Sequence, residues 1–391
     1  MKEEKIIARI AGAASEIGAE AWNACANPEG SDDPHPFTRY EFFAACEESK
    51  SATARTGWRP CHLVIENGGR ITGLLPMYLK SHSQGEYVFD WGWADAFQRA
   101  GGEYYPKLQA SVPFTPVTGH RLLVAAGAPL EETRNALLAA GATAVSEFDA
   151  SSLHITFMTE SEWKAAGALG FLQRNDQQFH WQNDGYASFD DFLSRLSSSK
   201  RKNLRKERAA VAAEGVTFEW LSGRDITEAH WDIFFDFYMD TGGRKWGRPY
   251  LTRNFFSRVG ATMGEQIVLI LAKRAGRHIA GALNFKGQGV LFGRNWGCTE
   301  NIPFLHFETC YYQAIDYAIA HKFARVEAGA QGEHKLVRGY MPVPTYSAHF
   351  IAHSGLRRAV SDYLRQERVA VAENIEAMAE HGPFRKTDGN Q

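Results

Sequence analysis

Two separate segments of the chain share one pattern of strands and turns. Residues 61–93, CHLVIENGGRITGLLPMYLKSHSQGEYVFDWGW, and residues 266–298, QIVLILAKRAGRHIAGALNFKGQGVLFGRNWGC, each begin with a β-rich run that ends in a Gly/Arg turn. A second run follows, interrupted by Gly73 or Gly281, and then a polar turn and an aromatic run that ends in Trp-Gly. Each segment predicts a three-stranded antiparallel meander. The shared features favour an internal duplication over chance.

Helices are predicted on both sides of each meander. A chain of 391 residues suits two domains, and its 44% hydrophobic and 13% aromatic content is enough for two cores. We expect an N-terminal unit over residues 1–180 and a C-terminal unit over residues 181–391, the latter carrying the active site. The fold class is α/β (α+β), with a mixed, largely antiparallel sheet flanked by helices in each unit. The sequences that predict helices are SDDPHPFTRYEFFAACEES, EETRNALLAAGA, FDDFLSRLSSSKRKNLRKERAAVAAEG, ITEAHWDIFFDFYMDTGGR and FLHFETCYYQAIDYAIAHKF.

Charge and cysteine usage exclude several classes of protein. The formal net charge of −2 argues against a general nucleic-acid coat. The five cysteines are scattered and form no CxxC pair, which favours free thiols in a reducing compartment over a disulfide framework or a zinc ribbon. The N-terminus lacks the apolar core of a signal peptide, and no stretch approaches the roughly 18 apolar residues that span a bilayer. We therefore expect a cytoplasmic protein without a transmembrane segment.

The segment GAQGEHKLVRGYMP, residues 329–342, concentrates ionisable groups among three glycines. It follows a predicted short strand, ARVEAG, and loops at strand ends are where sites form in α/β domains. Glu333 and His334 are candidate general bases. Lys335 and Arg338, with Gln331 beside them, are candidates to bind a phosphate or a carboxylate. The alternative is a structural turn held by salt bridges.

The preceding predicted helix, residues 304–323, adds a second group of candidates. His306 and Glu308 lie near its start, and Tyr311 and Tyr312 follow Glu308 at spacings of three and four residues. A partly buried glutamate has a raised pKa and could accept a proton from an amine. The alternative for Glu308 is an acid that complements the helix dipole.

Other candidates lie outside these two segments. On a helix, Arg201, Arg205 and Arg208 share one face, which suits a polyanion such as a tRNA acceptor arm or a lipid-linked pyrophosphate, although a solvated face is the simpler interpretation. Four residues at the ends of the two aromatic runs are candidates to line a cleft: Trp91, Arg294, Asn295 and Trp296. Lys245, in a Gly-rich loop, is a further candidate to contact an anion. We expect no metal site, because no zinc-motif spacing of histidines and carboxylates occurs.

Three stretches carry a resemblance to a known family. They are HPFTRYEFFAACEES, SSSKRKNLRKERAAVAAEGV, and the long LHFETCYYQAIDYAIAHKFARVEAGAQGEHKLVRGYMPVPTYSAHF. On these stretches the chain resembles the FemAB-like, peptidoglycan biosynthesis/recognition-type branch of the GNAT acyltransferase superfamily. The resemblance covers nearly the whole chain and implies two GNAT-like units in tandem.

The resemblance also implies a function. Family members with assigned function transfer an aminoacyl group from a charged tRNA to an amine on a cell-wall precursor, so we expect an N-acyl- or aminoacyltransferase. The junction RNWGCTENIPFLHFE lacks the Q/R-x-x-G-x-G/A loop with which ordinary acetyltransferases bind the coenzyme A pyrophosphate. Two alternatives remain: an acyltransferase that uses acyl-CoA or an acyl carrier protein, and a non-catalytic module that binds an anionic or cell-wall ligand. The expected donor is aminoacyl-tRNA or acyl-CoA, the expected acceptor is a small or lipid-linked amine, and DNA is not an expected partner.

Overall fold

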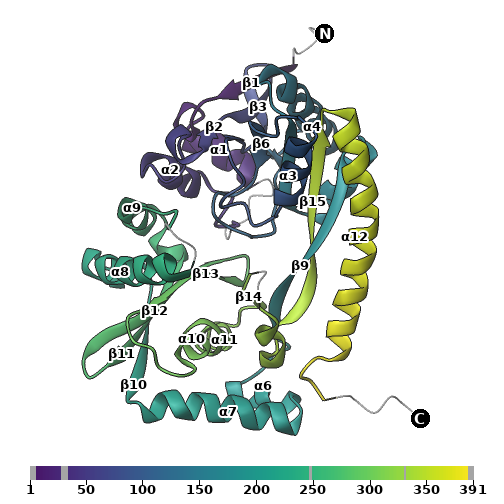
Figure 1. Ribbon diagram of the computed structural model, residues 1–391. Coiled ribbons are helices and arrows are strands. Elements are labelled where there is room, and N and C mark those ends of the chain that lie inside the picture. Colours follow the sequence, from purple (N-terminus) through teal and green to yellow (C-terminus); the bar gives the residue numbers. More distant parts are fainter. Residues whose placement is uncertain (1–5, 28–33, 246–248, 330–331, 386–391) are drawn as a thin grey trace. The chain divides into compact units, whose positions relative to one another are not determined.

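The protein, analysed as a computed structural model, is described over residues 6–27, 34–245, 249–329 and 332–385 (Figure 1). It divides into two compact units. Unit 1 comprises residues 1–176, 250–255 and 345–372, and unit 2 comprises residues 177–249, 256–344 and 373–391. We expected a single boundary near residue 180. The chain first passes from unit 1 to unit 2 between Asp176 and Gln177, and it then returns to unit 1 twice.

Unit 1 contains two groups of strands. The first is a four-stranded antiparallel sheet in the order β1-β3-β4-β7, and the second has the order β15-β8-β6-β5-β2, in which only the β6–β8 pair is parallel. The strands are β1 (Ile6–Ala11), β2 (Trp58–Pro60), β3 (His62–Asn67), β4 (Arg70–Leu75), β5 (Tyr78–Lys80), β6 (Lys107–Ala110), β7 (Leu123–Val124), β8 (Ser152–Met158) and β15 (Met341–Ile351). The helices are α1 (Ala19–Ala26), α2 (Tyr40–Glu48), α3 (Trp91–Arg99), α4 (Leu130–Glu147), α5 (Glu160–Ala168) and α12 (Ser354–Glu380), the last of which runs beyond the unit at Ala372.

The core of unit 1 forms where α4 packs between its two groups of strands. Leu137 and Leu138 of α4 are fully buried in one cluster with Leu63 of β3 and with Leu153 and Ile155 of β8. Burial of an aliphatic side chain of this size contributes about 1.5–3 kcal/mol. Alternate residues of β8 face this core, so the residues between them face the other side of the strand.

Unit 2 is built on a sheet with the order β10-β11-β12-β13-β14-β9. The β13–β14 pair is parallel and the other described pairs are antiparallel. The strands are β9 (Leu172–Gln182), which begins in unit 1, β10 (Val216–Leu221), β11 (Ile267–Arg274), β12 (Arg277–Gly287), β13 (Val290–Cys298) and β14 (Arg325–Glu327). The helices are α6 (Phe189–Arg195), α7 (Ser198–Ala213), α8 (Glu228–Lys245), α9 (Arg253–Met263), which begins in unit 1, α10 (Leu305–Phe307) and α11 (Gln313–Ala320).

The second predicted meander is present and the first is only partly so. β11, β12 and β13 form the meander of residues 266–298, and β13 contains Trp296-Gly297 as expected. In residues 61–93, β3 and β4 pair with each other, but β5 belongs to the other group of strands. The prediction that Trp91-Gly92 ends a strand is wrong, because Trp91 is the first residue of α3.

The side chains around the start of α3 give a physical reason why a helix begins at Trp91, where a strand end was predicted. The Asp90 carboxylate is bonded to Lys107 and, at 2.7 Å, to the hydroxyl of Tyr104, which fixes the backbone at this residue. Trp93 is buried and Trp91 is 47% exposed, so these residues divide between the two sides of a surface helix. The aromatic run that resembles a strand therefore ends in the first residues of the amphipathic helix α3.

Candidate functional site

The candidate site lies in unit 2 where two parallel strands separate. β13 pairs with β14 only from Val290 to Phe292, opposite Arg325 to Glu327, and β13 then continues without β14 to Cys298. The register between β12 and β13 shifts here, since Leu283 pairs with Asn295 while Asn284 pairs with Gly293. Arg294 is thus the extra residue of a β-bulge. Bulges often turn a side chain toward a site, and open α/β sheets bind ligands where neighbouring strands diverge.

Lys335 is a buried cation at this place. The polar segment forms a 3₁₀ turn over Glu333–Arg338, and the Lys335 side chain is 3% exposed. Its ammonium donates to the backbone carbonyls of Ala328 at 2.6 Å and Gly329 at 3.0 Å, and no carboxylate among the described residues forms an ion pair with it. Burial, together with the positive charge of Arg294, lowers the pKa of Lys335 to about 7. An uncompensated buried cation with one N–H left over is suited to an anionic oxygen.

Two residues beside Lys335 were not among the sequence-based candidates. His180 of β9 pairs with Glu327 of β14 in the strand register, and the His180 Nε2 lies 3.8 Å from the Glu327 Oε2. Both side chains are buried, and within the part of the chain that the structure describes neither of these two atoms has a hydrogen-bond partner. Burial lowers the pKa of His180, and the charges of Arg294 and Lys335 lower it further. The available signal was the position of Glu327 at the end of a short strand.

Aromatic rings next to this cluster bring together four of the predicted residues. The His306 ring lies 5.1 Å from that of Trp296, 5.4 Å from that of Tyr311 and 6.2 Å from that of His334. The Tyr311 hydroxyl and the His334 Nε2 are 3.0 Å apart. Trp296 and His306 also line a cavity of about 290 Å³, together with Leu305, Thr241 and Cys298. A cavity of this size accommodates a small organic group.

The rest of the 3₁₀ turn is anchored to the preceding helix and to α7. The Arg338 guanidinium bonds to both carboxylate oxygens of Glu207 at 2.8 and 2.9 Å and to the Tyr312 hydroxyl at 3.0 Å. Tyr312 also bonds to Glu207. Gly339 ends the turn with a φ of 88°, a backbone conformation that favours glycine. Arg338 and Tyr312 thus hold the turn in place, so they are already paired with protein groups.

Glu308 occupies a π-helical turn, Glu308–Tyr312, between α10 and α11. Such turns are rare and are frequent at functional sites. The Glu308 carboxylate accepts from Arg208 at 2.9 and 3.2 Å and from the Gln313 amide at 2.8 Å. Arg208 also bonds to Asp316 at 2.6 Å. Burial raises the pKa of Glu308, but this carboxylate is bonded to the Arg208 guanidinium, whereas the Tyr311 hydroxyl contacts His334.

The remaining predicted residues differ in how they are placed. Asn295 is half-buried on β13 beside the bulge, and Trp91 lies on α3 in unit 1 and not on a strand. Lys245 is the last residue of α8, but its side chain and that of Glu333 lie outside the described part of the structure, as does the whole of Gln331. On α7, Arg205 is exposed and pairs with Asp190 at 2.9 Å, and Arg201 is half-buried. The Arg208 of the same face is the one bonded to Glu308 and Asp316.

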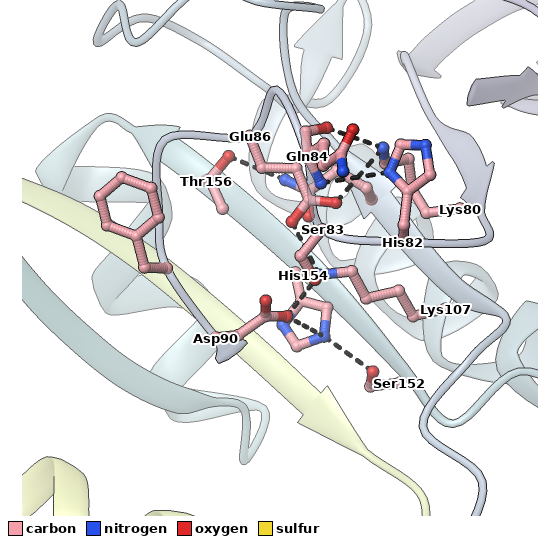
Figure 2. A network of polar contacts seen from close by, with 12 residues as sticks. Lys80, His82, Ser83, Gln84, Glu86, Asp90, Lys107, Ser152, His154 and Thr156 are labelled. Atoms are coloured by element: carbon pink, nitrogen blue, oxygen red, sulfur yellow. Dashed lines mark hydrogen bonds and ion pairs between the residues drawn. The ribbon is translucent and has the colours of Figure 1, made fainter. Parts of the chain in front are cut away.

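Unit 1 contains a separate buried polar network (Figure 2). Lys80 of β5 and Lys107 of β6 pair directly across the two strands, and Glu86 bonds to Lys107 at 2.7 Å. The ring nitrogens of His154 and His349 are 2.7 Å apart. Burial lowers the pKa of Lys80 to about 7. Because two carboxylates, Glu86 and Asp90, balance the two lysines, this network holds the segment before α3 against the sheet of unit 1.

The fold is α/β, with one mixed, helix-flanked strand arrangement in each unit. The chain belongs to the FemAB-like family, described as peptidoglycan biosynthesis/recognition, which it matches over residues 13–386. Membership supports a transferase of the aminoacyl or acyl class. A search of the curated proteins found no match.

Three solved structures share the fold at low sequence identity. FemX is 12% identical, with 88% of this chain and 98% of that chain covered and a TM-score of 0.53. L-PGS from Bacillus licheniformis is 11% identical, with 86% and 99% covered and a TM-score of 0.51. A conserved protein of unknown function from Bacteroides thetaiotaomicron is 11% identical, with 88% and 100% covered and a TM-score of 0.51. Within the described residues, no helix combines the length and the apolar character needed to cross a membrane.

Proposed function

We propose that this protein transfers an aminoacyl group to an amine on a cell-wall precursor, and that the reaction takes place where β13 and β14 separate. Transfer of an acyl group to an amine passes through a tetrahedral intermediate with a negatively charged oxygen. The protein must stabilise this oxygen, remove a proton from the amine and hold both substrates in place. The family description supports the cell-wall acceptor.

The observation that carries the proposal is the buried Lys335 ammonium. Its two backbone acceptors fix its position without neutralising its charge, since both are uncharged carbonyl oxygens. The third N–H is available for the oxygen of the intermediate. Keeping such a donor out of water increases its effect on a developing charge. Lys335 is therefore the group that we assign to the oxyanion.

His180 and Glu327 are the groups that we assign to the amine. Their facing atoms, Nε2 and Oε2, have no hydrogen-bond partner among the described residues, and both act as acceptors when the His180 ring carries its proton on Nδ1. An acceptor amine beside both atoms would donate to them, and its proton would pass to the imidazole as its nitrogen bonds to the ester carbon, while Glu327 stabilises the resulting positive charge. When the intermediate collapses, the ester carbon–oxygen bond breaks and the imidazolium gives this proton to the leaving ribose oxygen of the tRNA. The lowered pKa of His180 keeps its ring neutral and able to accept that proton near pH 7.

The other candidates take supporting roles in this proposal. His306 and Trp296 line the cavity that receives the transferred group, and Tyr311 orients His334 at its edge. Arg294 and the outward-facing cations of α7, Arg201 and Arg205, bind anionic parts of the substrates. Glu308, Arg208 and Arg338 hold the π-helical turn and the 3₁₀ turn in their observed geometry.

Charged tRNA is the donor that we favour over acyl-CoA. Helix α10 starts at Leu305 after Phe304, which has a φ of 66°, and it is three residues long before the π-helical turn begins. Such a start provides no glycine-rich run of backbone N–H groups for a pyrophosphate. Coenzyme A remains the alternative donor to be tested beside tRNA.

The test uses the full chain with labelled aminoacyl-tRNA or acyl-CoA as donor and a muropeptide bearing a free amine as acceptor. We expect transfer from aminoacyl-tRNA. We expect Lys335→Met to lower kcat by about 10²–10³-fold, the usual effect of removing an oxyanion donor. Lys322→Met, which removes an exposed lysine of the same unit, is the matched control and should keep full activity.

Two results would contradict the proposal. Wild-type turnover by Lys335→Met would exclude the oxyanion role. If the muropeptide raises the melting temperature but neither donor gives product, the protein is a binding module. Transfer from acyl-CoA but not from aminoacyl-tRNA would support the proposed site and show that the donor is acyl-CoA.

A further inference from the structure

Three potential metal ligands meet on unit 2, away from every residue used above. They are Glu219 on β10, His230 in the first turn of α8 and His278 on β12. One ligand atom from each lies within 4.8 Å of the other two. The sequence did not reveal them, because they come from three elements and no short motif contains two of them.

The chemistry of this cluster suits a divalent transition metal. The His278 Nε2 lies 2.6 Å from the Glu219 Oε1, and the two imidazole rings have their centroids 6.0 Å apart. All three side chains are half-buried, so the cluster is partly shielded yet reachable from solvent. Two imidazoles and one carboxylate are a common set of protein ligands for Zn²⁺, with a water completing the tetrahedron.

Thr227, the residue before α8, orients His230. Its backbone amide donates to the His230 Nδ1 at 3.1 Å, and its hydroxyl lies 3.2 Å from the same nitrogen. The ring proton therefore lies on Nε2 in this arrangement. A metal on Nε2 would move that proton to Nδ1, which would then donate to the Thr227 hydroxyl in place of accepting from the amide.

One positive charge beside the cluster would repel a bound metal ion. The Lys273 ammonium lies 2.7 Å from the Glu219 Oε2, the oxygen that does not face His278. A metal bound through Oε1 would be close to this ammonium, so the lysine lowers the affinity without occupying the same oxygen.

We propose that Glu219, His230 and His278 form a Zn²⁺ site. Its effect would be structural. β10 is the outermost strand in the order of unit 2, and its described strand pairing is with β11, so a metal would add a link from β10 to β12 and to the start of α8. An ion that binds only the folded arrangement stabilises it.

The test measures metal binding directly on the full chain. After dialysis against a chelator, we expect titration calorimetry with ZnCl₂ to show one equivalent of tight binding and a higher melting temperature. Addition of CoCl₂ in place of zinc should give the visible absorption of tetrahedral cobalt. His278→Ala and Glu219→Gln should each weaken Zn²⁺ binding at least 10-fold. Lys273→Met should tighten it several-fold.

Matched variants distinguish this site from binding elsewhere on the surface. His381→Ala removes an exposed histidine of the same unit and should leave Zn²⁺ binding unchanged. Thr227→Val tests the orienting hydroxyl and should weaken binding about 10-fold. The proposal fails if the wild type binds no stoichiometric Zn²⁺, or if His278→Ala and His381→Ala bind it equally well.

Discussion

At the scale of single residues, the pairing of each cation decides what it can do. The sequence drew attention to Lys335, Arg338 and Arg208 together, and all three lie near the π-helical turn. Arg338 is paired with Glu207, and Arg208 is paired with Glu308 and Asp316. In each pair the two residues lie about a hundred positions or more apart in the sequence. Sequence patterns cannot predict such distant partners, so they could not indicate that, of these three cations, Lys335 has no ion-pair partner among the described residues.

The first residue-scale prediction concerns pH. The free enzyme should lose its Lys335 ammonium as the pH rises past about 7, so kcat/KM for transfer should fall above that pH. In Lys335→Arg the guanidinium stays protonated, and the falling limb should move to higher pH. A pH–rate profile of both proteins measures this. A rising limb near pH 7, together with an inactive arginine variant, would instead make Lys335 the base.

The second residue-scale prediction concerns the charge of Glu308. Glu308→Gln removes the charge that partners Arg208 inside unit 2, and we expect a loss of about 1–3 kcal/mol in the free energy of unfolding. Turnover per folded molecule should change little. Urea unfolding and activity assays on the same sample test this. Unchanged stability with lost turnover would restore Glu308 as a general base.

At the scale of elements, the sequence predicted the meander of unit 2 correctly and half of that in unit 1. β11, β12 and β13 have consistent alternation and tight turns, so local rules are enough. Trp91-Gly92 looks like a strand end, but the bonds of Asp90 to Lys107 and Tyr104 begin a helix there. The polar segment after β14 was expected as a loop and is one 3₁₀ turn, which depends on contacts with α7 and the π-helical turn.

The element-scale prediction tests that anchoring. Arg338→Lys keeps the positive charge but cannot reproduce the paired bonds to Glu207 or the bond to Tyr312. We expect the 3₁₀ turn to loosen, with a loss of about 1–3 kcal/mol in stability and a lower kcat, because Lys335 lies on the same turn. Thermal unfolding and turnover measure both. Arg277→Lys, a change at a largely exposed residue of β12, is the control.

At the scale of the whole molecule, composition and length suit two domains but cannot show how the chain is shared between the two compact units. Unit 1 needs residues 345–372, which follow nearly all of unit 2 in the sequence. β15 pairs with β8 through residues such as His349 and His154, and α12 supplies Leu356 and Leu364 to a core cluster with Trp93. A single boundary drawn from the repeat pattern does not show that the chain passes back into unit 1.

The molecule-scale prediction concerns a fragment. Residues 1–180 expressed alone lack β15 and α12, so the edge of β8 and the cluster around Trp93 stay exposed. We expect this fragment to aggregate or to lack a cooperative unfolding transition. Circular dichroism with heating and size-exclusion chromatography test it. A soluble, cooperatively folding fragment would show that the later segments are dispensable.

The late arrival of β15 has a consequence during synthesis on the ribosome. Between the end of β8 at Met158 and the pairing residue Tyr346, 346 − 158 = 188 positions must be translated. At about 5–20 residues per second this takes on the order of 10–40 s. Throughout that interval β8 can pair with β6 on one edge, but its other edge lacks β15, which would make the nascent chain a substrate for chaperones that bind emerging polypeptides.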